Sequence, residues 1–147
     1  MEDPYNLQRF IKKHKITYDT AYQELSNGRK QSHWMWWIFP QIVGLGFTET
    51  SYQYAIKSID EAKAFLEHAY LGNHLREILN LLLTLDTDDA YEVFGNPDCL
   101  KLCSCVTLFA QVAHEEVFQK VLDKFYAGKM DKKTLKILKK LSGTEKL

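Results

Sequence analysis

The sequence predicts an all-α fold, a compact single-domain bundle of about eight or nine helices, several of them short. Apolar residues recur three and four positions apart in most segments of the 147-residue chain, which is the spacing of one helical face. Signals that start and end helices, such as Ser-x-x-Glu and Asn-Gly, separate these segments at short intervals. No segment shows the alternating pattern of paired strands, so a β-sheet fold is not expected.

Length and composition predict one ordinary globular domain over residues 1–147. Apolar residues make up 46% of the chain and charged residues 26%, which is enough to form a core without metals or disulfides. The 19 basic and 19 acidic residues leave no net charge. Because a general binder of nucleic acid normally has a basic excess, the sequence gives no strong signal for nucleic-acid binding.

We expect a cytoplasmic monomer that holds no metal and no cofactor. The chain has no run of about 18 apolar residues that could span a membrane, and its acidic N-terminus lacks the apolar core of a signal peptide. Cys99, Cys103 and Cys105 form C-x3-C-x-C, a spacing that matches no zinc or redox motif. These cysteines are therefore interpreted as small hydrophobic residues in a reducing compartment.

The first half of the chain is expected to contain several short helices. Asp3-Pro4 predicts a helix start, and that helix should end in the cationic stretch 12–15. A second helix should then run from Tyr18 to a stop at Asn27-Gly28. Ser32 is expected to cap a short helix over 33–39, although the high β propensity of this segment leaves an extended conformation open.

Capping signals define the remaining helices. Thr50 is expected to cap a helix over 50–57, and Ser58-Ile-Asp-Glu61 fits a capping box for the next helix. Leu71-Gly72-Asn73 should interrupt the chain before a central, very hydrophobic helix over 75–85. Four later segments are also predicted to be helical: 90–94, ended by Gly95; a helix that starts at Asn96-Pro97; 117–126, ended by Gly128; and a last helix capped by Asp131.

The segment 28–41 has the residue types of a ligand site. It contains all three tryptophans within four positions, together with Arg29, Lys30, His33 and Gln41. Tryptophan stacks on flat ligands, the cations could hold a phosphate at a helix start, and histidine titrates near neutral pH. The Gln41 side-chain amide could form hydrogen bonds with a polar edge of the ligand. The alternative is a core plug made of Trp36, Ile38 and Phe39.

Two further groups of residues could contribute to such a site. Asp98, Lys101, Ser104 and Thr107 lie three positions apart and form a polar stripe on one side of a helix. This stripe is either simply solvated or completes a pocket beside the tryptophans, where a Ser–Lys pair could act as a nucleophile. Arg76 could bind an anionic group, or form an ion pair with a carboxylate such as Asp60 or Glu61.

Seven lysines after position 128 predict a solvated helix face. Contact with nucleic acid is the alternative, but no aromatic residues lie between these lysines to stack on bases.

Several blocks, taken in order, resemble the family known as domain of unknown function 1810. The resemblance covers nearly the whole chain and is most specific in Gly-x-Lys-x-Ser-His-Trp-Met-Trp-x-Ile-Phe-Pro-Gln. The matching residues are 3–10, 28–41, 44–46, 58–62, 71–72, 75–77, 94–95, Asp98, 100–102, Ser104 and 107–110. The resemblance implies an all-helical, mostly bacterial domain without an established activity.

This family is sometimes labelled calpastatin-like, but inhibitors of that type are disordered and this chain has the pattern of a folded protein. Two departures from the family pattern are visible. Trp37 stands where phenylalanine is expected, which keeps the aromatic character, and Cys103 and Cys105 flank Ser104 where more polar residues are usual. The second departure argues against a general reactive role for these cysteines.

These patterns predict a small-ligand site for a nucleotide or ADP-ribose-like molecule. Trp34 and Trp37 would stack on the ligand, Lys30 and Arg76 would hold its anionic groups, and His33 would be the acid or base if the site is catalytic. The further ligand contacts are predicted to be Gln41, Tyr54, Lys101 and Ser104. The alternative is a non-catalytic protein-interaction module in which the tryptophan segment is part of the core.

Overall fold

The computed structural model describes residues 2–145, and within them the all-α prediction is confirmed. The described residues form nine helices: α1 Gln8–Ser26, α2 Met35–Ile38, α3 Glu49–Gln53, α4 Ile59–Glu67, α5 Ala69–Leu83, α6 Ala90–Phe94, α7 Asp98–Val112, α8 Glu116–Tyr126 and α9 Lys132–Glu145. Extended pairing among these residues is limited to one parallel bridge between Ile42 and Ile56.

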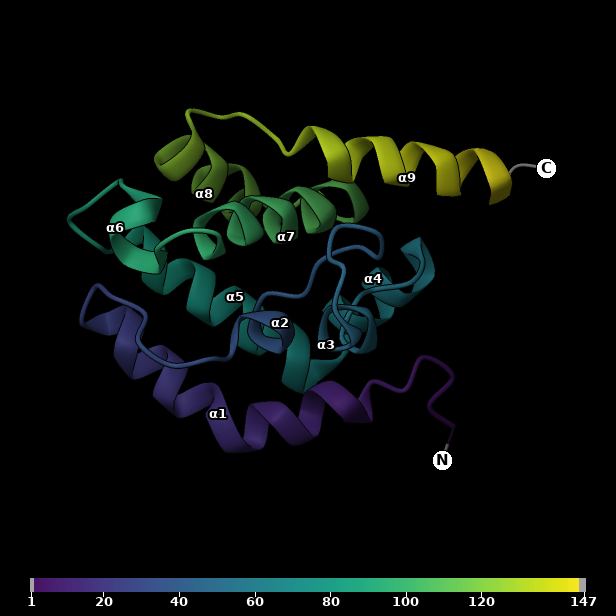
Figure 1. Ribbon diagram of the computed structural model, residues 1–147, viewed down its shortest axis with the longest axis horizontal. Helices are drawn as coiled ribbons and strands as arrows, with labels where there is room; N and C mark the ends of the chain where they lie inside the picture. The colour runs from purple at the N-terminus through teal and green to yellow at the C-terminus, as the bar shows by residue number, and fades with distance from the viewer. Residues whose placement is uncertain (1, 146–147) are drawn as a thin grey trace.

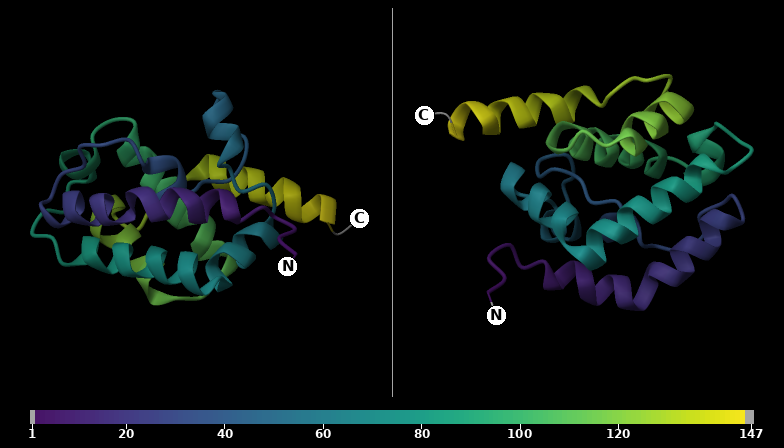
Figure 2. Two further views of the ribbon diagram at one scale, coloured as in Figure 1. Left: turned by 90° about the horizontal axis from the view of Figure 1, so that it is seen from below. Right: turned by 180° about the vertical axis from the view of Figure 1, so that it is seen from behind.

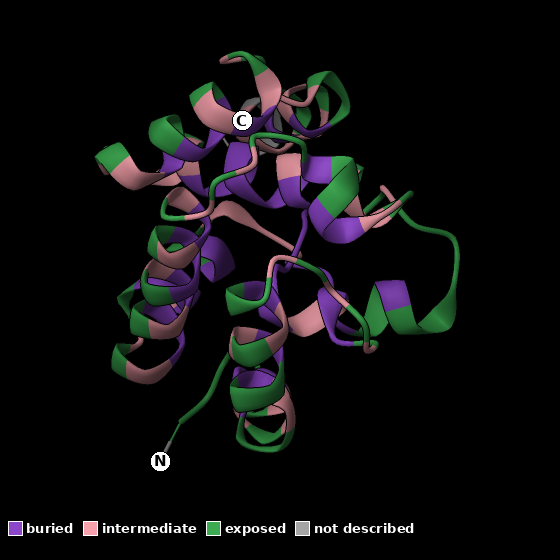
Figure 3. Cartoon of the chain, turned by 90° about the vertical axis from the view of Figure 1, so that its left-hand side faces the viewer, coloured by how far each residue is buried: buried purple, intermediate pink, exposed green. Residues whose placement is uncertain are grey.

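The long helices lie roughly side by side. Figure 1 shows α1 along one side of the molecule and α9 along the opposite side, with α5 and α7 between them. Helix α5 packs against α1, α4 and α8, and α7 packs against α8, α4 and α9. The apolar faces of these helices turn inward (Figure 3). Helix α5 therefore holds the central place that its hydrophobic sequence predicts.

Helix α1 is one continuous helix, and the prediction of two helices in this region was wrong. Its buried residues, Phe10, His14, Tyr18, Ala21 and Leu25, form a single face that continues through the expected break. The start at Pro4 was also predicted too early. The Asp3 carboxylate accepts hydrogen bonds from the backbone N–H groups of Leu7 and Gln8, at 2.8 and 3.0 Å. It therefore satisfies the free N–H groups of a helix that begins later.

Helix α5 runs through Gly72, so the predicted interruption there was also wrong. The break lies at His68, which separates α4 from α5. A Cβ atom on Gly72 would lie 2.0 Å from the carbonyl oxygen of Leu66. Gly72 is therefore required for the close approach of the two helices and does not end one of them.

The caps of the short helices differ in detail from the predictions. Helix α2 spans only Met35–Ile38, and the Ser32 hydroxyl donates to the Glu24 carboxylate instead of capping α2. Helix α3 is capped by Thr48, not Thr50, through a reciprocal bond pair with Ser51. The Ser32 side chain is taken by Glu24 of α1, a partner outside the local sequence pattern. The Thr48 cap is itself a local pattern, so here the prediction only placed the cap two residues too late.

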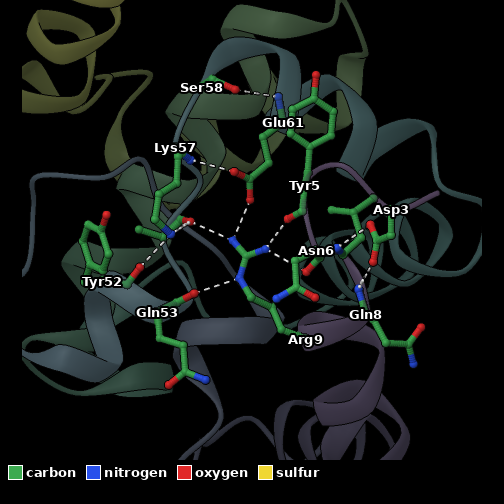
Figure 4. Close-up of polar contacts among 12 residues, drawn as sticks. Asp3, Tyr5, Asn6, Gln8, Arg9, Tyr52, Gln53, Lys57, Ser58 and Glu61 are labelled. Atoms are coloured by element: carbon green, nitrogen blue, oxygen red, sulfur yellow. Dashed lines mark hydrogen bonds and ion pairs between the residues drawn. The ribbon is translucent and has the colours of Figure 1, made fainter.

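The Ser58 cap is present, but its capping box is incomplete. The Ser58 hydroxyl accepts from the Glu61 backbone N–H at 3.0 Å. The Glu61 carboxylate accepts instead from the Lys57 N–H at 3.0 Å, and it pairs with the Arg9 guanidinium at 2.6 Å (Figure 4). The Arg9 guanidinium also donates to the carbonyl oxygens of Tyr5, Asn6, Gln53 and Ala55. Arg9 therefore fastens the start of α1 to the α3–α4 connection.

No helix within residues 2–145 is long and apolar enough to cross a membrane.

Candidate ligand-binding groove

The three tryptophans of the segment 28–41 have different surroundings. Trp34 is fully buried, and its Nε1–H donates to Glu24 Oε1 at 2.9 Å. Trp37 donates through Nε1–H to Thr17 Oγ1 at 2.9 Å and contacts α1, where the Lys13 ammonium lies 4.9 Å from its ring centroid. Trp36 is half-buried and lines an open groove.

The groove has a volume of about 1150 Å³ and three walls. The segment 36–46 supplies one wall, the first half of α7 supplies the second, and the connection from α8 into α9 supplies the third. Its apolar surface is formed by Trp36, Leu45, Leu100, Met130 and Leu135. The volume lies slightly above the usual range for small-molecule pockets, which ends at about 1000 Å³.

Gln41 places an unpaired hydrogen-bond donor at this groove. The residue is only 7% exposed, and its Nε2 has no hydrogen-bond partner among the described residues. The backbone is fixed, because the Gln41 carbonyl oxygen accepts from the Ile56 N–H at 2.8 Å. Gln41 also lines an adjoining cavity of about 30 Å³, which is large enough for one water molecule. A buried donor without an acceptor lowers stability, so this amide needs an explanation beyond packing.

The groove carries an excess of positive charge. Lys101, Lys129, Lys132 and Lys133 line it, and Asp131 is the one carboxylate in its lining among the described residues. Asp131 Oδ2 is already held, accepting from the Ser104 hydroxyl at 3.1 Å and from the Thr134 hydroxyl at 2.6 Å and N–H at 3.0 Å. Lys129, Lys132 and Lys133 are exposed and face solvent.

Lys101 and Lys30 meet at Asp98. Lys101 Nζ lies 3.1 Å from Asp98 Oδ1, and Lys30 Nζ lies 2.9 Å from Asp98 Oδ2. Burial by itself would raise the pKa of Asp98, but the hydrogen bonds from the two lysines hold it below its ordinary value. The Lys101 ammonium also lies 4.0 Å from the centroid of the Trp36 ring, a cation–π contact. Neither Lys30 nor Asp98 lines the groove, so Lys30 is linked to it only indirectly, through the contact of Asp98 with Lys101.

The nucleophile candidates in the groove are not activated. The Ser104 hydroxyl bonds to Asp131 and to the Leu100 carbonyl oxygen, and no hydrogen bond joins it to Lys101 in the described structure. Burial raises the pKa of the Cys103 thiol to about 11, so this group is a neutral thiol at physiological pH. The arrangement is suited to binding by contact, charge and hydrogen bonds.

Several predicted site residues lie away from the groove. His33 is exposed and does not line it. Tyr54 is buried between Phe10 and Trp37. Arg76 is held by the Glu115 carboxylate, through Nε at 2.7 Å and Nη2 at 2.8 Å, and not by Asp60 or Glu61 as the sequence suggested.

The groove brings together Gln41, Lys101 and Ser104 of the predicted set. It adds Trp36, which one interpretation of the sequence placed in the core, and the α8–α9 connection, which no sequence pattern associated with a site. Tyr126 at the end of α8 donates its hydroxyl to the Cys99 carbonyl oxygen, which fixes its ring against α7. No local sequence signal identifies these residues, because only the packing of α9 on α7 brings them to Trp36.

Comparison with protein families identifies one match, which covers most of the chain. Residues 4–138 match the model of the family described as "Protein of unknown function (DUF1810)". The chain belongs to this family. It is also similar to the crystal structure of a conserved hypothetical protein from Mycobacterium tuberculosis, with 40% sequence identity and a TM-score of 0.91. That similarity covers 93% of this chain and 99% of the other.

No curated protein matches this member of the family. Neither the family description nor the name of the mycobacterial protein specifies an activity or a ligand. The groove is therefore the feature on which a function can be based.

Proposed function

We propose that the groove binds a small anionic molecule with a flat ring, of the nucleotide or ADP-ribose-like class. The observation that carries the proposal is the Gln41 amide, which is buried at the groove wall with an unpaired Nε2 donor. A ligand that offers an acceptor atom there would satisfy this donor. Such sites are typical of binding surfaces, where polar groups are held ready for a ligand.

Charge and shape support the class of ligand. Lys129, Lys132 and Lys133 surround one end of the lining, where α9 begins, so an anionic group would find ammonium groups there. The apolar surface around Trp36 suits a flat ring. The rival idea, a protein-interaction module, predicts a flat exposed patch, whereas this surface is concave.

The proposal concerns binding and assigns no reaction. His33 lies outside the groove, so proton transfer by His33 is not part of it. Trp34, Trp37, Tyr54 and Arg76 act in this proposal as structural residues. The proposed contacts are Trp36, Gln41, Lys101 and the lysines at the start of α9.

Thermal unfolding in the presence of AMP, ADP, ADP-ribose, adenosine and inorganic phosphate tests the proposal. We expect the anionic nucleotides to raise the Tm more than adenosine does, because binding to the native state alone stabilises it. The variant Lys132→Ala/Lys133→Ala should lose most of this rise. Both lysines are exposed, so the unliganded Tm should change little.

The matched control is Lys136→Ala/Lys139→Ala, which removes two exposed lysines from the same helix that do not line the groove. It should keep the full rise in Tm. The proposal fails if none of the compounds raises the Tm of the unmodified protein. Equal losses in the two double variants would also contradict it, because they would indicate a general charge effect.

A further inference from the structure

Lys57 is a half-buried lysine whose ammonium forms no ion pair with a carboxylate of the described residues. It directly precedes Ser58, the N-cap of α4. Its Nζ donates to the carbonyl oxygens of Tyr52 and Ala55, at 2.8 and 3.0 Å (Figure 4). Because burial of an ammonium group without a counter-ion penalises the charged form, this setting favours the neutral amine.

Arg9 places a second cation beside Lys57. The Ala55 carbonyl oxygen that accepts from Lys57 also accepts from Arg9 Nη2, at 2.9 Å. Arg9 is held by five hydrogen bonds, so its charge stays at this position. Burial and the Arg9 charge lower the pKa of Lys57, although the Glu61 charge opposes the shift. A lysine that is desolvated and lies next to another cation is an activated nucleophile.

The Lys57 side chain lines a pocket of about 620 Å³ between the N-terminal segment, α3 and the start of α4. Figures 1 and 2 show these three parts on the same side of the molecule. The volume is within the usual range for small-molecule sites. The Tyr52 ring provides a flat surface at the amine, since Lys57 Nζ lies 4.6 Å from its centroid. The other ionisable side chains that line the pocket are those of Tyr5, Arg9, Glu49, Tyr52 and Glu61.

The hydrogen bonds of Lys57 are compatible with a reaction at Nζ. A neutral amine that donates its two N–H groups to the Tyr52 and Ala55 carbonyl oxygens keeps its lone pair for an electrophile. Both carbonyl oxygens also have other donors, because that of Ala55 accepts from Arg9 and that of Tyr52 accepts from the Ala55 N–H at 3.3 Å. Loss of the amine hydrogens would therefore leave neither carbonyl oxygen unpaired.

We propose that Lys57 is a covalent binding site for a small aldehyde, which it captures as an imine in this pocket. The amine nitrogen attacks the carbonyl carbon and a C–N bond forms. The two amine hydrogens then leave with the aldehyde oxygen as water, so the step needs no oxidant or reductant. This pocket shares no lining residue with the groove, and the inference does not depend on the proposed function.

Brief treatment of the full chain with pyridoxal 5′-phosphate, followed by borohydride to fix any imine, tests the inference. Peptide mass spectrometry then gives the extent of modification at each lysine. Near neutral pH, Lys57 should be modified several times faster than Lys63, an exposed lysine of α4. The rate at Lys57 should reach its half-maximum at a lower pH than the rate at Lys63. It should also level off as the aldehyde concentration rises, because the pocket fills.

The unfolded chain is the matched control. In urea both side chains are solvated, so Lys57 and Lys63 should react at equal rates. Lys57→Arg should lose the fast modification and keep the slow modification of Lys63. Equal rates at the two lysines in the folded protein would overturn the inference, as would modification of Lys57 that rises linearly with aldehyde concentration. A fast reaction of Lys57 that persists in urea would also overturn it, because the pocket would not be its cause.

Discussion

His14 Nδ1 lies 2.9 Å from His74 Nδ1, and the planes of the two imidazole rings are nearly parallel, with only 4° between them. His14 Nε2 lies 2.8 Å from the Trp37 carbonyl oxygen, which can only accept. His14 therefore carries its proton on Nε2 and accepts through Nδ1 from a proton on His74 Nδ1. This chain of bonds joins α1, α5 and the segment that carries the tryptophans.

The histidine pair predicts that the protein loses stability in mild acid. Burial lowers the pKa of His14 to about 4 and also lowers that of His74. The unfolded chain, with histidine near 6.5, therefore binds more protons than the native state between about pH 6.5 and 4. The stabilisation should be complete above about pH 6.5 and should decrease by up to about 3 kcal/mol as the pH falls to 4.

Urea unfolding at several pH values measures this effect. His14→Gln should be less stable at pH 7 but should show a flatter dependence on pH, because its buried titrating group is gone. His33→Gln, a change at an exposed position, should keep the slope of the unmodified protein. A steep slope retained in His14→Gln would assign the effect to other groups.

The Arg9–Glu61 ion pair should contribute strongly to stability. The two side chains are only 10% and 4% exposed, and removal of Glu61 leaves a buried guanidinium with carbonyl partners alone. We expect Glu61→Ala to lower the free energy of unfolding by about 3 kcal/mol or more. Glu61→Gln, which keeps an acceptor, should lose less. The exposed Glu49→Ala serves as the control in the same denaturation series and should change stability by less than about 0.5 kcal/mol.

The Arg76–Glu115 pair should matter less. Its side chains are 34% and 33% exposed, so solvent and salt screen the interaction. A double-mutant cycle of Arg76→Ala and Glu115→Ala should give a coupling of about 1 kcal/mol or less that decreases as salt is added. Neither change should affect the rise in Tm with ADP. If Arg76→Ala lost ADP binding and Glu115→Ala did not, Arg76 would be a ligand contact, as the sequence predicted.

Replacement of Gln41 should raise the stability of the free protein and weaken ligand binding. Gln41→Met keeps the approximate length of the side chain and removes the unpaired donor, so the free energy of unfolding should rise by about 1–2 kcal/mol. The rise in Tm with ADP should decrease at the same time. Urea unfolding and ligand titration of one preparation measure both effects. A less stable Gln41→Met would mean that the amide already has a partner in solution, such as a water in the adjoining cavity.

Local sequence patterns were sufficient to predict most helices. The Ser58 and Asp131 caps and the stop at Gly95 are all present, because each depends on backbone groups within a few residues. Where tertiary contacts compete, the local patterns failed. Gly72 looks like a break in the sequence but is a contact between α4 and α5, and Ser32 looks like a cap but bonds to Glu24 on α1.

The sequence by itself determined the helical class, the family and the stretch in which to look for a site. Only the tertiary structure decided which tryptophan faces the groove. Trp34 and Trp37 donate hydrogen bonds to Glu24 and Thr17 of α1. Trp36 instead lines the groove. Likewise, α9 brings Lys132 and Lys133 to the groove through its packing on α7. The physical reason is that a local pattern fixes helices, while the direction of each side chain depends on partners distant in sequence.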